Sequence, residues 1–124
     1  MAKLRVFEAF SGIGTQTMGL SRANIDHDVV AISEIDSYAI RSYEAIHGSV
    51  NNLGDISQID TKTIPDHDLF TYSFPCQSIS VAGLQHGLDP NSGTRSSLLW
   101  ECQKVIDIKR PKYLLMENVK NLVG

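Results

Sequence analysis

Two side chains that could carry out nucleophilic and acid–base chemistry stand just beyond strand-like segments. Cys76 comes shortly after Asp68–Ser73, and Glu117 directly follows Lys112–Met116. A thiolate is a nucleophile, and a carboxyl group can exchange a proton with a reacting group. Because Pro75 cannot extend a sheet ladder, we expect Cys76 just past the carboxyl end of its strand, where α/β sheets bind ligands. A buried structural thiol and an ordinary surface glutamate are the alternatives, and position alone leaves them open.

A second group of residues is typical of nucleotide binding. Leu4–Phe10 has the composition of a strand, and the turn Ser11–Gly14 follows it before helical sequence begins. Its glycines would let the backbone approach a ligand closely. Glu34 follows the next predicted strand, His27–Ser33, at the spacing from the glycine turn where an acidic residue binds ribose hydroxyls. The turn lacks the third glycine of the full fingerprint, so a plain tight turn is the alternative reading.

The remaining elements alternate in the way that a parallel sheet requires. Asp36 is suited to cap a helix that Gly48 ends, and a further helix runs from near Ser97 to Pro111 with Cys102 on its core-facing side. Asn51–Ile56 is the weakest of about five predicted strands, and would place Asp55 at the ligand edge. Alternating strands and helices predict an α/β fold of the Rossmann type with a mostly parallel sheet.

Composition restricts the class of protein. The chain has 124 residues, 42% of them hydrophobic and 20% charged, which fits one soluble domain, and no apolar run reaches membrane-spanning length. Two unlike cysteines and four scattered histidines offer no metal-binding spacing, and a reducing cytoplasm is the expected compartment. A net charge of −3 is the wrong sign for a self-sufficient nucleic-acid binder. The aperiodic stretch from Ser78 to Arg95 is expected to be a functional lid.

Six short motifs occur in a set order: Phe10–Gly14, Glu34, Gly54–Ile56, Pro75–Gln77, Arg95–Leu98 and Glu117–Val119. Together they closely resemble the DNA cytosine-5 methyltransferases of bacterial restriction–modification systems and phages. The resemblance runs from Leu4 to Gly124. Any one motif is weak, but all of them in this order are very unlikely to arise by chance.

The resemblance implies a fold and chemistry dependent on S-adenosylmethionine, and it assigns roles residue by residue. Cys76 would attack carbon 6 of cytosine, Glu117, protonated in a partly buried site, would donate to ring nitrogen 3, and Asn118 would help to orient it. Contacts to DNA would come from Gln77, Ser80 and Arg95. The residues implied to bind the cofactor are Phe10, Gly12, Ile13, Gly14, Glu34, Ile35, Asp55, Ile56, Pro75 and Leu98.

The resemblance also implies what lies outside these residues. Residues 1–124 correspond to the N-terminal part of the catalytic, cofactor-binding domain, whereas a target-recognition domain and a C-terminal segment are not matched. The implied partners are double-stranded DNA with a flipped cytosine and a second polypeptide that carries the recognition domain, with neither a membrane nor a metal. Little activity is expected of the isolated chain. The alternatives are a transfer RNA cytosine-5 methyltransferase and a non-catalytic cofactor-binding module.

Overall fold

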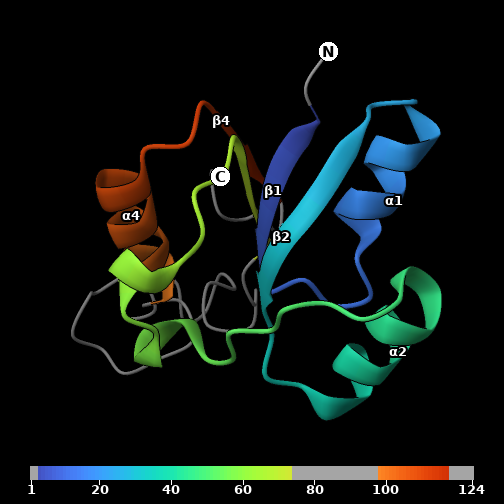
Figure 1. Ribbon diagram of the computed structural model, residues 1–124. Helices are drawn as coiled ribbons and strands as arrows, with labels where there is room; N and C mark the ends of the chain where they lie inside the picture. Colours follow the sequence, from blue (N-terminus) through green and yellow to red (C-terminus); the bar gives the residue numbers. More distant parts are fainter. Residues whose placement is uncertain (1–2, 74–97, 118–124) are drawn as a thin grey trace, which may run out of the picture.

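The structure is a computed structural model that describes residues 3–73 and 98–117 (Figure 1). Strands and helices alternate along these residues, as the sequence predicts. The elements are β1 (Leu4–Ala9), α1 (Thr15–Arg22), β2 (His27–Ser33), α2 (Ser37–His47), the 3-10 turns η1 (Ile56–Gln58) and η2 (Thr61–Thr63), β3 (Leu69–Tyr72), α4 (Leu98–Lys109) and β4 (Tyr113–Met116).

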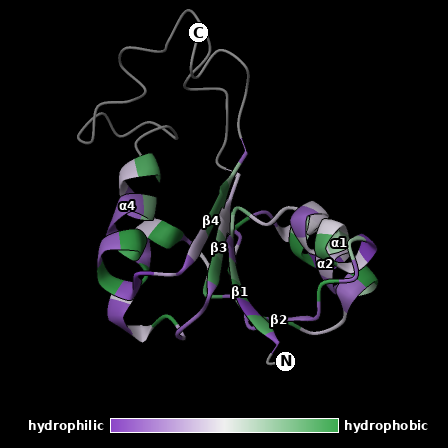
Figure 2. Ribbon diagram, turned by 90° about the horizontal axis from the view of Figure 1, so that it is seen from above, coloured by the Kyte–Doolittle hydropathy of each residue, from purple (hydrophilic) through white to green (hydrophobic). Residues whose placement is uncertain are grey.

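The described strands form one parallel sheet in the order β2-β1-β3-β4. Helices α1 and α2 cover one face of the sheet, and α4 covers the other (Figure 2). The predicted α/β fold with a parallel sheet is therefore confirmed. The strand order reverses at β1, because β2 lies on one side of β1 and β3 on the other. Ligands of open α/β sheets bind at such a switch point, beyond the carboxyl ends of the strands.

The prediction of a strand over Asn51–Ile56 is wrong. Within the described residues, this segment makes a single isolated bridge, between Ile32 and Asn52, so the described sheet has four strands. The physical reason lies just after the bridge. Gly54 has a φ of +86°, which turns the chain away from the sheet, and the Asp55 side chain then caps η1 by accepting a hydrogen bond from the Ser57 amide.

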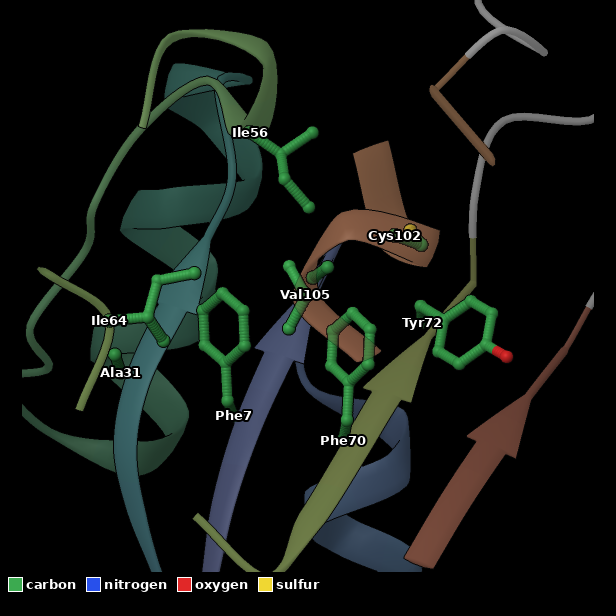
Figure 3. Close-up of a cluster of buried hydrophobic side chains, with 9 residues drawn as sticks. Phe7, Ala31, Ile56, Ile64, Phe70, Tyr72, Cys102 and Val105 are labelled. Atoms are coloured by element: carbon green, nitrogen blue, oxygen red, sulfur yellow. The ribbon is translucent and has the colours of Figure 1, made fainter. Parts of the chain in front are cut away.

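The core lies between the sheet and the α4 layer (Figure 3). Phe7 of β1 and Phe70 of β3 stack with their ring centroids 5.4 Å apart, and Tyr72 stacks on Phe70 at 4.7 Å. Cys102 and Val105 of α4 are buried against this aromatic row. All of β3 and the last four residues of β1 are buried, as expected of central strands in a parallel sheet covered on both faces.

Helix α2 begins and ends where the sequence predicts. The Asp36 side chain accepts a hydrogen bond from the Tyr38 amide, and Gly48 terminates the helix with a positive φ of +86°. Tyr43 of this helix is buried, whereas Ile46 is exposed. No helix in the described parts of the chain is long and apolar enough to cross a membrane.

Candidate cofactor-binding site

A cavity of about 450 Å³ opens at the carboxyl ends of β1, β2 and β3. It lies at the switch point of the sheet, and its volume falls within the range typical of pockets for small ligands. Six of the ten predicted cofactor-binding residues line it, which shows that the structure brings together residues far apart in the sequence. The lining consists of Phe10, Ser33, Glu34, Ile35, Asp36, Gly54, Asp55, Ile56, Ser73 and Leu98.

The glycine turn forms the start of this site. Gly12 and Gly14 have left-handed φ values of +56° and +83°, and the Gly14 amide closes the turn by donating to the Ser11 carbonyl at 2.9 Å. A Cβ on Gly14 would lie 2.5 Å from Nε2 of His47 and 2.7 Å from Cε2 of Tyr43. The second glycine is therefore required for helix α2 to pack closely against the turn, whereas the first leaves open space in front of the backbone.

Glu34 lies at the end of β2 and is held by backbone amides. Its Oε1 accepts from the Gly12 amide at 2.8 Å, and its Oε2 accepts from the amides of Ile35 and Asp36 at 2.9 and 3.0 Å. Hydrogen bonds from backbone amides to a carboxylate are of the stronger, charge-assisted kind. They fix the carboxylate beside the glycine turn, so the two parts of the predicted nucleotide-binding pattern are in direct contact.

A second wall of the cavity, next to the end of β2, is formed by Gly54, Asp55 and Ile56. Ile56 is buried, and Asp55 uses one oxygen, Oδ1, to accept from the amide and the hydroxyl of Ser57. Ser33 fastens this wall to the end of β2, because its hydroxyl donates to the Gly54 carbonyl at 2.6 Å. The hydroxyl groups of Ser33 and Ser57 thus hold this wall, through Gly54 and Asp55 respectively.

A buried polar cluster behind the glycine turn was not identified from the sequence. Glu8 of β1 is fully buried, and its Oε2 accepts hydrogen bonds from the hydroxyls of Thr17 in α1 and Tyr43 in α2, both at 2.6 Å. Burial, and then the neighbouring Glu8, raise the pKa of Tyr43 well above its ordinary value. The signal in the sequence was an acidic residue inside an otherwise apolar strand. The cluster ties both helices to β1.

Glu117 follows β4, and its backbone continues the ladder by donating to the Tyr72 carbonyl at 3.0 Å. Strand β4 pairs with β3, so Glu117 lies beside the strand that leads toward Cys76, as the sequence predicts. The side chain accepts from Nε2 of Gln16 at 2.8 Å. The expectation of a partly buried carboxyl is wrong for this chain, because Glu117 is exposed at the end of the sheet's outermost described strand.

Cys102 is buried in the core, and burial raises the pKa of its thiol to about 12. The burial confirms the predicted core-facing position of Cys102. In the described ranges, no group of three or more His, Cys, Asp or Glu side chains is arranged to hold a metal ion. Several predicted site residues lie outside the described residues: Pro75, Cys76, Gln77, Ser80, Arg95 and Asn118.

Comparison with known proteins finds similarity to methyltransferases of bacteria and phages. The chain is 45% identical to the type II methyltransferase M2.ScrFI of Lactococcus lactis subsp. cremoris, over 98% of this chain and 48% of that protein. It is 43% identical to the orphan methyltransferase M.Rho11sI of Bacillus phage rho11s, over 100% of this chain and 24% of that protein. The chain therefore spans between about a quarter and about half the length of these relatives.

Solved structures share the fold. The Dnmt2 methyltransferase of S. pombe superposes with a TM-score of 0.76 at 31% identity, over 96% of this chain and 35% of that one. The Entamoeba histolytica methyltransferase EhMeth superposes with a TM-score of 0.84 over 99% of this chain and 40% of that one, and at 23% identity it supports the fold alone. The model of the C-5 cytosine-specific DNA methylase family matches residues 4–124, and the chain belongs to that family.

Proposed function

We propose that this chain is the cofactor-binding and nucleophile-bearing part of an enzyme that methylates carbon 5 of cytosine in DNA. The observation that carries the proposal is the cavity at the switch point. It gathers Phe10, Glu34, Asp55 and Leu98 from separate parts of a chain whose relatives are named as methyltransferases. Use of S-adenosylmethionine is a general property of the family to which the chain belongs.

The cavity fits that cofactor in size and in the chemistry of its lining. Glu34 offers a carboxylate to ribose hydroxyls, Ile35 and Ile56 offer apolar surface to the adenine, and Leu98 closes the methionine side. The open space in front of Gly12 would admit the rest of the ligand. We assign Gly12, Ile13, Gly14, Asp55 and Pro75 to the same site. When bound, S-adenosylmethionine supplies an electrophilic methyl group on a positively charged sulfur.

The nucleophile in the proposed mechanism is Cys76. Its thiolate attacks carbon 6 of cytosine, which breaks the 5,6 double bond and makes carbon 5 nucleophilic enough to accept a methyl group. Glu117 donates a proton to ring nitrogen 3 in the same step, with Asn118 orienting it. After carbon 5 has taken the methyl group, loss of the carbon 5 proton to a base expels the thiolate and restores the double bond, and the nitrogen 3 proton returns to Glu117.

The target base has to leave the stacked duplex before this chemistry can occur. We propose that residues 78–95 close over the flipped cytosine, and that Gln77, Ser80 and Arg95 contact the DNA. The chain's net charge of −3 means that most of the affinity for DNA has to come from elsewhere. We assign it to a target-recognition region of the kind implied by the family, on a second polypeptide or a longer form of the chain.

The test is covalent trapping. The purified chain is incubated with S-adenosylmethionine and duplex DNA containing 5-fluorocytosine, alone and with a polypeptide carrying the remaining part of a relative. Fluorine at carbon 5 blocks the final elimination, so an active enzyme stays bonded to the DNA. We expect cofactor binding by the chain alone, and a DNA adduct at Cys76 in the complemented sample.

Cys76→Ser is the control, and it should remove the adduct while keeping cofactor binding. Failure of the chain to bind the cofactor would refute the cofactor assignment. An adduct that persists in Cys76→Ser would refute the identity of the nucleophile. Complemented wild-type protein that binds the cofactor and forms no adduct would contradict the proposed reaction.

A further inference from the structure

Asn52 is partly buried between the two walls of the cavity and contacts both of them. Its Oδ1 accepts hydrogen bonds from the backbone amides of Glu34, at 3.1 Å, and Gly54, at 3.0 Å. Its Nδ2 donates to the Glu34 carbonyl at 3.0 Å. The Asn52 side-chain amide is therefore hydrogen-bonded to the N–H group and the C=O group of Glu34 and to the N–H group of Gly54.

These contacts are not needed to hold residues 51–53 against the sheet. Two backbone hydrogen bonds already do this: the Ile32 amide donates to the Asn51 carbonyl at 2.9 Å, and the Leu53 amide donates to the Ile32 carbonyl at 2.8 Å. The Asn52 side chain reaches past this bridge to the two residues that line the cavity. Its role is therefore separate from the pairing of its own backbone.

An amide side chain is well suited to this position. It carries an acceptor and a donor on the same planar group, so it satisfies an N–H group and a C=O group of Glu34 at once. Aspartate would lack the donor, and alanine would leave three partly buried backbone groups without these partners. The amide thus fixes the end of β2 and the Gly54 turn at a set separation.

We propose that Asn52 is a positioning residue for the ribose end of the cofactor site. It holds the Glu34 backbone, and hence the Glu34 carboxylate, at the correct distance from the wall formed by Gly54 and Asp55. This inference rests on the proposed function, because it assumes that Glu34 binds the ribose. Asn52 itself does not touch the ligand.

Binding of S-adenosylhomocysteine by isothermal titration calorimetry tests the proposal. We expect Asn52→Ala to raise the Kd roughly tenfold, since each hydrogen bond to a partly buried group contributes about 1 kcal/mol and the site can relax partially. Asn51→Ala is the matched control. The Asn51 side chain is exposed and its contribution to the bridge is through its backbone, so the Kd should stay at the wild-type value.

A double-mutant cycle with Glu34→Gln separates positioning from general loosening. If Asn52 acts through Glu34, the double variant should bind about as weakly as Glu34→Gln alone, because the lost interaction is the same. If the increases in Kd caused by Asn52→Ala and by Glu34→Gln instead multiplied in the double variant, the proposal would be overturned. A wild-type Kd for Asn52→Ala would also overturn it.

Amide hydrogen exchange supplies a readout that does not depend on the ligand. In Asn52→Ala, the amides of Glu34 and Gly54 should exchange faster, while those of Ile32 and Leu53 should keep their protection. Unchanged exchange at Glu34 and Gly54 would overturn the positioning role. Failure of wild-type protein to bind S-adenosylhomocysteine, with this exchange pattern intact, would instead count against the proposed function alone.

Discussion

The two edges of the described sheet differ in how far other described residues cover them. At the β2 edge, Ile32 is paired with residues 51–53, and the Asn52 side chain ties that bridge to Glu34. At the β4 edge, all four strand residues are exposed, from 44% for Met116 to 58% for Tyr113, and all four are apolar or aromatic. Exposed apolar edge strands are a liability that proteins normally cover.

The difference separates the two tasks of the site. Glu34, the residue proposed to bind the ribose, lies at the β2 side, and its carboxylate accepts hydrogen bonds from the described amides of Gly12, Ile35 and Asp36. Glu117, the proposed proton donor, lies at the β4 side, and its side chain has one described contact, to Gln16. Among the described residues, the proposed ribose-binding carboxylate therefore has more hydrogen-bond partners than the proposed proton donor.

The largest expected effect tests whether stability resides in the centre of the sheet. Phe70→Ala removes a fully buried ring that stacks on Phe7 and Tyr72, and should cost about 3–5 kcal/mol of unfolding free energy. Leu114→Ala on the neighbouring strand β4 should cost less than about 1 kcal/mol, because Leu114 is half exposed. Urea titration measures both. Equal losses would mean that β4 is covered in solution.

Removal of the Tyr43 hydroxyl tests how much the buried Glu8 cluster stabilises the side of the sheet that α1 and α2 cover. Tyr43→Phe takes a hydrogen-bond donor away from the buried Glu8 carboxyl group and should cost about 1.5–3 kcal/mol. Tyr38→Phe is the control on the same helix. Tyr38 is exposed, so its variant should stay within about 0.5 kcal/mol of wild type in thermal or urea unfolding. A similar change in both variants would argue against the buried cluster.

The dependence of the unfolding free energy on alkaline pH tests whether α4 is tightly packed against the sheet, although the neighbouring strand β4 is exposed. Burial raises the pKa of the Cys102 thiol from 9.0 to about 12, so the folded state holds the proton more firmly than the unfolded chain. The resulting stabilisation is complete below pH 9 and is lost as the pH rises to about 12, with a slope of at most about 1.4 kcal/mol per pH unit.

Urea titrations at pH 8, 9 and 10 check this expectation. Tyr43 and Tyr72 also have raised pKa values, but their ordinary value is 10.0, so the interval from pH 9 to 10 reports mainly on Cys102. Cys102→Ala should flatten the decline in that interval. An unchanged slope would mean that the thiol reaches solvent.

The smallest expected change in stability accompanies a clear change in association. Leu115→Lys places a charge on the open β4 edge and should leave the unfolding free energy within about 0.5 kcal/mol of wild type. Sedimentation velocity should show less concentration-dependent self-association of the chain. Ile46→Lys, at an exposed apolar site on α2, is the control and should leave association as in wild type. If Ile46→Lys reduced self-association and Leu115→Lys did not, the surface that associates would lie on α2 and not on β4.

Much of the fold was predictable because the signals are local. The glycine turn, the Asp36 cap and the Gly48 terminator each act within a few residues, and the alternation of strands and helices selects a parallel sheet. The prediction of a strand over Asn51–Ile56 was wrong because a short polar segment gives only a weak signal for a strand. The positive φ at Gly54 and the cap at Asp55 then determined its structure.

The site was predictable in part, for a related reason. Glu34 and the glycine turn follow a known spacing, and the Gly12 amide does reach the Glu34 carboxylate. Asn52 and the Glu8 cluster follow no spacing, since their partners come from elements whose mutual placement only the folded chain defines. The exposure of Glu117 was missed because burial at an edge depends on what lies beside it.

The central position of β1 has a consequence for synthesis on the ribosome. One partner of β1 is encoded nearby, at His27–Ser33, whereas the other begins only at Leu69. A nascent chain therefore carries Phe7 with no Phe70 to cover it until β3 has emerged. We expect the proposed ribose-binding end of the site, although translated early, to become stable only after Tyr72 has left the exit tunnel.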